Sequence, residues 1–216
     1  MINPWEQIDL NTYELHMSSN SVLQLQMLNN ITKQQLSDYI HNNVVILGIA
    51  GGNGLENIDI NTTKKVYGID INSSYLDCCK DRYPKLAGIL ELICCDLSNT
   101  NTILPSSDIL ICNLIIEYLE ADNFVELIKN NSSNVNMVSC VIQKNNNNNF
   151  VSSSNLTSAL EPILSIHNDI REDHLKDEFL RVGFICKREM EYPLPNGKEF
   201  IRIDFINNSG DSKQIV

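Results

Sequence analysis

The sequence is poor in basic residues and has no long apolar run. Lys and Arg number 16 against 27 Asp and Glu, which gives a formal net charge of −11 over 216 residues. Because nucleic acids and anionic membrane surfaces are bound by clustered Lys and Arg, this balance argues against both partners. No apolar run approaches the about 20 residues that a helix needs to cross a bilayer. We therefore expect no nucleic-acid partner and no membrane partner.

Cysteine spacing typical of a metal site is also missing. The 7 cysteines form no C-x-x-C motif, and some of them stand in the adjacent pairs Cys78-Cys79 and Cys94-Cys95. Adjacent cysteines rarely bridge each other and the number is odd, so we expect neither a disulfide framework nor a structural zinc site. The first residues carry an acid where a secretory signal needs basic and then apolar residues. These features favour a reduced, cytoplasmic protein without a bound metal.

Hydrophobic residues make up 43% of the chain and recur in short blocks. A chain of this length buries roughly 70% of its unfolded surface, which is enough for one core. Each apolar run is apolar almost continuously, as a strand covered on both faces requires. The alternation of such runs with polar segments of helix length predicts a mostly parallel sheet with helices on both faces, an α/β fold. The runs cover 44–50, 65–70, 90–96, 108–116 and 136–144.

The last third of the chain has a different pattern. Residues 155–182 are predicted to be helical and to end at Gly183, a typical helix C-cap. Two strand-like segments, 184–192 and 198–206, then flank Asn196-Gly197, which is a strong hairpin signal. We expect the sheet to finish with this antiparallel pair.

Three helix starts are predicted from capping residues and turns. Ser21 is placed to cap a helix whose apolar residues recur at helical spacing over 22–31. Ser73 or Ser74 is placed to cap the helix after the second apolar run. The glycine-rich segment after the first run is expected to open the next helix.

The few glycines are concentrated at one turn. Without Cβ atoms the chain can turn sharply and a ligand can approach its backbone, and N–H groups at a helix start attract carboxylate or phosphate. A dinucleotide-binding turn needs G-x-G-x-x-G. Read from Gly48 the turn has Ala50 at the second glycine, and read from Gly52 it has Asn57 at the third, so neither register fits. Four of the 9 glycines lie within seven residues: Gly48, Gly51, Gly52 and Gly54.

The same segment resembles the first motif of the class I S-adenosylmethionine-dependent methyltransferases. In that family a strand runs into a hydrophobic-acid-x-G-x-G-x-G turn, with which LGIAGGNG aligns over residues 47–54. Gly48 stands where the family usually has an acid, and Ala50 replaces the first glycine. Gly52 and Gly54 keep the other two. The resemblance implies that these four residues bind S-adenosylmethionine.

Further motifs follow in the family's order. Asp70 ends the second run, and the resemblance implies that its carboxylate accepts both ribose hydroxyls of the cofactor, with Ile71 beside it. After the third run, Asp96 would contact the adenine amine and Leu97 would pack on the ring. The segment DILICNLIIEYL resembles the fourth motif, so two more residues are candidates for the cofactor wall, namely Asn113 and Tyr118.

Methyl transfer from a sulfonium is an in-line displacement in which the protein chiefly supplies alignment. A base is needed only if the acceptor is protonated at neutral pH. Tyr13 and His16 lie before the first motif and are the candidate catalytic residues, which could orient or deprotonate an acceptor. Glu117 and Tyr118 are rivals for that role. The serines at 152–154 either line the acceptor pocket or cap a loop.

Together these features predict a Rossmann-like class I methyltransferase fold in a single domain, 1–216. Within it, residues 1–40 would form a helical lid, 41–144 the cofactor-binding half, and 145–216 the substrate-side helices and hairpin. We expect methyl transfer to a small-molecule acceptor by a monomer or homodimer. The alternatives are a nicotinamide-dependent oxidoreductase and a non-catalytic S-adenosylmethionine-binding protein; the missing acid at Gly48 keeps the second alternative open. The acceptor atom is not indicated.

Overall fold

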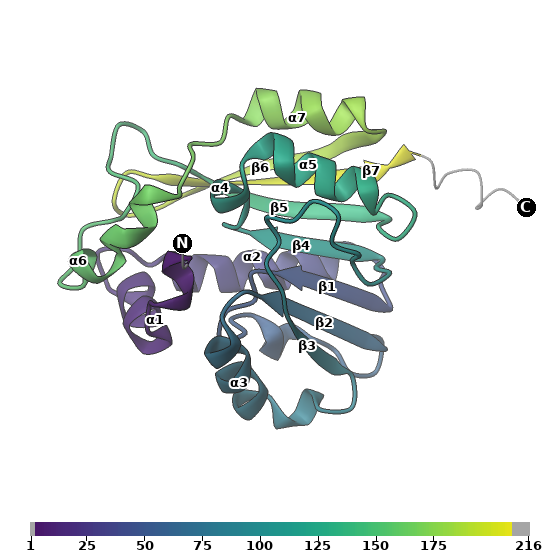
Figure 1. The fold of residues 1–216 in the computed structure, drawn as a ribbon, viewed down its shortest axis with the longest axis horizontal. Helices are drawn as coiled ribbons and strands as arrows, with labels where there is room; N and C mark the ends of the chain where they lie inside the picture. The colour runs from purple at the N-terminus through teal and green to yellow at the C-terminus, as the bar shows by residue number, and fades with distance from the viewer. Residues whose placement is uncertain (1–2, 209–216) are drawn as a thin grey trace, which may run out of the picture.

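The computed structural model describes residues 3–208, which are built around one seven-stranded sheet of order β3-β2-β1-β4-β5-β7-β6 (Figure 1). Strands β1 to β5 run parallel, whereas β7 is antiparallel to both β5 and β6. This topology confirms the predicted parallel sheet and its C-terminal antiparallel pair. The strands are β1 (Asn43–Leu47), β2 (Lys65–Asp70), β3 (Leu90–Cys94), β4 (Ile109–Asn113), β5 (Met137–Lys144), β6 (Phe184–Pro193) and β7 (Glu199–Asn207).

The helical segments lie between and around these strands. Within residues 3–208, none is both long enough and apolar enough to cross a membrane. The α-helices are α1 (Leu10–Ser18), α2 (Gln24–Asp38), α3 (Ser73–Arg82), α4 (Ile116–Leu119), α5 (Ala121–Asn130), α6 (Thr157–Leu160) and α7 (Glu172–Arg181). The short 3-10 helices are η1 (Pro4–Glu6), η2 (Leu55–Asn57), η3 (Pro84–Leu86) and η4 (Glu161–Ser165).

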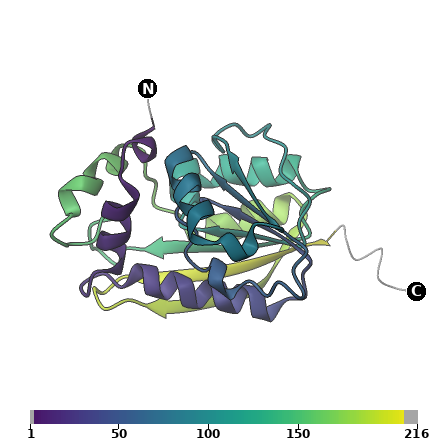
Figure 2. The ribbon, with the colours of Figure 1, turned by 90° about the horizontal axis from the view of Figure 1, so that it is seen from below.

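Successive strand residues face opposite layers of helices, which explains the continuous apolar runs. Val45 and Leu110 pack in one cluster with the apolar sides of α5 and α7. Val44 and Ile109 pack in a second cluster with α2 and α3. Figure 2 shows α2 and α5 on opposite sides of the sheet. Because both faces of β1 and β4 are buried, the polar side chains of these two strands, Asn43 and Asn113, lie at their ends.

The two predicted serine caps are wrong. Helix α2 begins at Gln24, after Leu23 in a left-handed conformation (φ 51°), and has no side-chain cap. Ser21 instead donates a hydrogen bond to the carbonyl oxygen of Ser153 (3.0 Å). At α3 the cap is Asn72, one residue earlier than predicted; its side chain accepts from the backbone N–H groups of Ser74 and Tyr75. Asn caps as well as Ser does, so composition alone did not distinguish the two positions.

The predicted helix after the glycine turn does not form either. Only η2, three residues long, follows the turn, and an extended loop then leads to β2. Helix α2 lies against this turn, since a Cβ on Gly54 would stand 2.7 Å from Thr32. The turn therefore offers no α-helix N-terminus to an anion, and ligands must bind through its backbone bend and the neighbouring strand ends.

Helical structure in the last third is less continuous than predicted. Residues 155–182 hold α6, η4 and α7, with a loop before α7. Pro162 lies at the start of η4, where it lacks an N–H group for an α-helical bond. Gly183 follows α7 in a left-handed conformation (φ 89°) and confirms the predicted helix end. Gly197 turns the hairpin with φ 81°.

A buried ionic network joins α2 to the C-terminal strands. Arg202 and Asp204 on β7 are both fully buried, and the Arg202 guanidinium donates to Asp204 at 2.9 and 2.7 Å. Arg202 also donates to Asp38 at the end of α2 (2.8 Å). Tyr39 and Ser139 donate their hydroxyls to the same Asp204 carboxylate. Among residues 3–40, α2 is therefore part of the packed body, whereas η1 and α1 precede it.

Candidate functional site

A cleft opens at the carboxyl ends of the parallel strands, which is where ligands bind in open α/β sheets. It holds about 730 Å³ of space free of protein atoms, open mouth included. Eight of the ten residues predicted to bind the cofactor line it: Gly48, Ala50, Asp70, Ile71, Asp96, Leu97, Asn113 and Tyr118. Sequence analysis did not single out Asn3, Trp5, Tyr75, Cys95, Ser98, Leu114, Ile115 and Leu119, which also line it.

The turn after β1 is held in a strained shape. Gly48 and Ala50 both adopt left-handed conformations, with φ values of 67° and 48°. Such a conformation is unfavourable for alanine, and strain of this kind persists only where surrounding contacts enforce it. Here the Ala50 N–H donates to the Asp70 Oδ2 atom at 2.8 Å. A further strained residue, Leu114 (φ 56°), lines the cleft just after β4.

The other two glycines of the motif, Gly52 and Gly54, do not line the cleft. Both have positive φ (87° and 97°), and a Cβ on either would stand 2.7 Å from a neighbouring side chain. That neighbour is Tyr83, just after α3, for Gly52, and Thr32 on α2 for Gly54. Close packing and backbone conformation account for glycine at these positions.

Asp70 is the fixed acid of the cleft. It ends β2 with 8% of its surface exposed. Its Oδ2 accepts from Ala50, and its Oδ1 accepts from the backbone N–H of Asn72 at 2.9 Å. Burial raises the pKa of the Asp70 carboxyl, and these backbone N–H bonds oppose the shift. Each carboxylate oxygen can accept a further bond, so the group can receive ligand hydroxyls.

The remaining residues predicted to bind the cofactor differ in whether their polar groups are already hydrogen-bonded within the protein. Asp96 is exposed at the rim, where Oδ1 accepts from the Ser98 N–H at 2.9 Å. Leu97 beside it is buried and presents an apolar surface. The Asn113 amide exchanges two hydrogen bonds with Gln35, at 2.9 and 3.0 Å, and also donates to Thr32. Asn113 thus anchors α2 to β4. Its amide is part of the cleft wall and is already hydrogen-bonded within the protein.

The N-terminal segment is held over the cleft by the residues around α3. The carbonyl oxygen of Trp5 accepts from the Asn72 side chain at 2.9 Å, and Tyr75 donates its hydroxyl to Ile8 at 2.8 Å. Glu14 on α1 forms an ion pair with Arg82. The Trp5 Nε1 atom is buried and has no hydrogen-bond partner among residues 3–208. Trp5 is the single Trp of the chain and lies in the predicted lid, and this was the sequence signal that could have identified it as a site residue.

A second pocket adjoins the cleft and shares Trp5, Tyr13, Leu114 and Tyr118 with it. It holds about 480 Å³ of space free of protein atoms, mouth included. His16 lines this pocket but not the cleft.

The two predicted catalytic residues differ in their protonation. His16 is buried, and its Nδ1 lies 2.8 Å from the Ser154 hydroxyl. Burial, with the nearby Lys198 cation, lowers the pKa of the His16 imidazole and favours its neutral form. Burial, with Asp70 and Glu14, raises the pKa of the Tyr13 phenol, so Tyr13 stays protonated at neutral pH.

Glu117, a rival in the sequence analysis, is the most deeply buried acid of the second pocket. Only 1% of its surface is exposed. Oε1 accepts from the backbone N–H of Gln143 at 2.8 Å, while Oε2 has no partner among the described residues. Burial raises the pKa of this carboxyl to about 7; Asp169 adds to the shift and the Gln143 N–H opposes it. The group can therefore exchange a proton near neutral pH.

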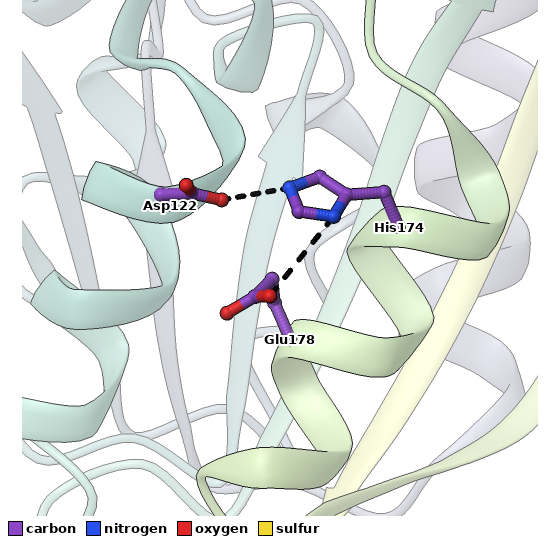
Figure 3. A group of neighbouring side chains, drawn as sticks. All are labelled: Asp122, His174 and Glu178. Carbon is purple, nitrogen blue, oxygen red and sulfur yellow. Dashed lines mark hydrogen bonds and ion pairs between the residues drawn. The ribbon is translucent and has the colours of Figure 1, made fainter.

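One group of possible metal ligands lies elsewhere, on α5 and α7 (Figure 3). Donor atoms of Asp122, His174 and Glu178 lie within 4.8 Å of one another, and the His174 Nε2 is 2.7 Å from Asp122. Glu178 also pairs with Arg181, a cation that opposes metal binding. None of the three lines the cleft or the second pocket. We interpret the group as a polar clamp between the two helices.

No protein-family model matches the sequence, and no curated protein matches it. Solved structures do match the fold. Magnesium protoporphyrin IX methyltransferase from Synechocystis PCC 6803, with bound S-adenosylhomocysteine, matches with a TM-score of 0.64 and 12% identity over 91% of this chain and 93% of that chain. The N-methyltransferase NodS from Bradyrhizobium japonicum WM9 matches with a TM-score of 0.65 and 10% identity over 95% of this chain and 99% of that chain.

A protein described as a putative RNA methyltransferase, from Pyrococcus horikoshii, matches as well, with a TM-score of 0.54 and 14% identity over 85% of this chain and 81% of that chain. Acceptors as different as a porphyrin and RNA thus occur with this architecture, and the likeness carries no information about substrate. What it does establish agrees with the resemblance seen in the motifs: the chain has the Rossmann-like fold of the class I S-adenosylmethionine-dependent methyltransferases.

Proposed function

We propose that this protein is an S-adenosylmethionine-dependent methyltransferase that acts on a small molecule. The observation that carries the proposal is the cleft itself. A strained backbone turn after β1 is hydrogen-bonded to a buried acid at the end of β2. A second pocket with a buried acid in its lining adjoins them and can take an acceptor.

The residues of the cleft fit the cofactor's chemistry. The Asp70 carboxylate is fixed by two backbone N–H groups and can accept from ribose hydroxyls. Asp96 and Leu97 offer a hydrogen-bond acceptor and an apolar surface to a purine base, and the bend at Gly48 lets a ligand approach the backbone. Bound S-adenosylmethionine would supply a methyl group already activated on its sulfonium.

On the acceptor side, Tyr13 and His16 would orient the acceptor. Tyr13 separates the two cavities and can donate a hydrogen bond from its protonated hydroxyl. His16 can accept a bond or a proton as a neutral imidazole. The walls around them are built by α1, α4 and the segment after β5.

The nicotinamide-dependent alternative has less support. Dinucleotide-binding domains have the strand order 3-2-1-4-5-6, whereas here β7 is inserted between β5 and β6. A non-catalytic S-adenosylmethionine-binding protein would have no need of a second pocket with a buried acid. We place the protein in the cytoplasm on the strength of its free cysteines.

Calorimetric titration with S-adenosylhomocysteine tests the proposal. We expect binding, and we expect Asp70→Asn to weaken it at least about ten-fold, because charge-assisted hydrogen bonds contribute about 1.5–3 kcal/mol each. Asp81→Asn, an exposed acid on α3, is the matched control and should leave the affinity unchanged. No binding at near-millimolar ligand, or stronger thermal stabilisation by NAD, would overturn the proposal.

A further inference from the structure

We propose that the second pocket binds an organic amine as the methyl acceptor, and that the amine nitrogen is held by the Glu117 carboxylate. The inference rests on the proposed function and specifies its substrate class. Four features support it: an unpartnered carboxylate oxygen, aromatic walls, the satisfied state of several other polar groups, and the absence of Lys and Arg among the described lining residues.

The first feature is the unpartnered oxygen. Glu117 lies in α4, directly after the carboxyl end of β4, and its Oε1 is tied to the backbone of β5 through Gln143. Its Oε2 is buried without a partner among residues 3–208. Such a buried oxygen is unfavourable unless something donates to it. In a pocket next to the cofactor cleft, the missing donor is best supplied by a ligand N–H.

The second feature is the aromatic surface around the pocket. The Trp5 and Tyr118 rings meet edge to face at 5.1 Å between centroids, and Trp5 and Tyr13 do so at 5.5 Å. Phe150 extends this surface beyond Tyr118, at 6.1 Å. Aromatic faces attract ammonium groups, and the attraction is stronger where water is excluded. An aromatic surface beside a carboxylate therefore suits an amine in either protonation state.

The third feature is that several other polar groups of the pocket are already used. Gln24 donates to Gln143 at 2.6 Å, and the Gln143 amide donates in turn to Asn145 and to the carbonyl oxygen of Phe150. The Ser152 hydroxyl accepts from Lys198 at 2.9 Å. These bonds hold the wall in place and leave Glu117 as the acid available to a ligand.

The fourth feature concerns charge. No Lys or Arg is among the described residues that line the pocket. Lys198 stands behind Ser152 and donates to it and to the carbonyl oxygen of Phe150 at 2.6 Å. A carboxylate or phosphate acceptor would meet Glu117 without a cation to neutralise it, whereas an amine would be attracted. The net charge of −11 also favours the approach of cations over anions.

The chemical step balances with these groups. The neutral amine nitrogen attacks the methyl carbon of the sulfonium donor, a C–N bond forms, and the C–S bond breaks with its electron pair left on the sulfur. The positive charge passes from sulfur to nitrogen. The nitrogen then releases a proton to the Glu117 Oε2 atom, which gives the N-methylated amine, a thioether and a carboxylic acid.

The test measures binding to protein saturated with S-adenosylhomocysteine. The probes are 2-phenylethylamine, benzylamine and cyclohexylamine, with 2-phenylethanol and 3-phenylpropionate as the matched alcohol and acid. We expect at least one amine to bind about ten-fold more tightly than the alcohol and the acid, because charge-assisted bonds are about twice as strong as neutral ones. Glu117→Gln should lower that amine's affinity about ten-fold while leaving the affinity for S-adenosylhomocysteine unchanged. Glu191→Gln, an exposed acid on β6, is the matched control.

The outcomes separate the two proposals. If S-adenosylhomocysteine binds but no amine shows Glu117-dependent affinity, the amine assignment is overturned and the methyltransferase proposal stands. Preferred binding of the alcohol or the acid also overturns it. If an amine binds through Glu117 but S-adenosylhomocysteine does not bind at all, the methyltransferase proposal fails while the pocket's chemistry stands. If both S-adenosylhomocysteine and an amine bind, mass spectrometry of a reaction with S-adenosylmethionine should detect the N-methylated form of that amine.

Discussion

Replacing Glu117 by Gln should stabilise the protein, and more so at higher pH. The carboxyl has a pKa of about 7 in the folded chain against 4.5 as its ordinary value. Between these values the folded chain binds more protons than the unfolded chain, so this group's contribution lowers stability as the pH rises through that window. Above pH 7 this pKa difference lowers the free energy of unfolding by roughly 3 kcal/mol. The physical reason is that a charged carboxylate is then buried with one oxygen unpaired.

The side chain of a glutamine at 117 keeps an oxygen to accept from Gln143 and carries no charge. Its stability advantage over the wild type should therefore grow by roughly 2–3 kcal/mol between about pH 5 and pH 8. Urea unfolding at a series of pH values measures it, and other titrating groups cancel in the difference. Glu191→Gln, at an exposed position on β6, is the matched control. A difference that stays constant across this range would refute the reasoning, since it would mean that Glu117 does not titrate there.

Two further predictions concern the fold. Asp204→Asn should lower the free energy of unfolding by up to about 3–5 kcal/mol, because the fully buried Arg202 then keeps only Asp38, at the end of α2, as an ionic partner. Urea unfolding beside Asp81→Asn measures the loss, and a loss below about 1 kcal/mol contradicts the role of the network. Gly54→Ala should cost more than about 1 kcal/mol, because φ is 97° and the new Cβ would stand 2.7 Å from Thr32. Gly88→Ala meets nothing within 4 Å and should be nearly neutral, so equal melting temperatures for the two variants would disprove the packing argument.

Much of the fold could be predicted from local patterns. Strands buried on both faces are apolar at nearly every position, so the runs at 44–50 and 108–116 indicated a covered parallel sheet. Asn196-Gly197 indicated the hairpin, because it favours the left-handed turn that Gly197 adopts. Asp70 could be predicted at a ligand-binding edge because parallel strands end at the same side of a sheet.

Other features depended on contacts between distant segments, and local patterns carry no signal for these. The turn after β1 leads to no α-helix, and α2, which comes from the N-terminal side, packs its Thr32 beside Gly54 there. Gly52 and Gly54 matched the motif, yet they serve the packing of α3 and α2 rather than the cleft wall.

The acid of the second pocket shows the same division most clearly. The sequence by itself determined that Glu117 follows the fourth strand, beside Tyr118. Only the tertiary structure decided that α1, β5 and the segment around Phe150 enclose it, with one oxygen bonded and the other left without a partner. Burial sets the cost of a charge, and burial is a property of the whole packed chain. That is why the sequence could name Tyr13 and His16 as catalytic candidates and Glu117 as a rival, but could not indicate the protonation state of any of them.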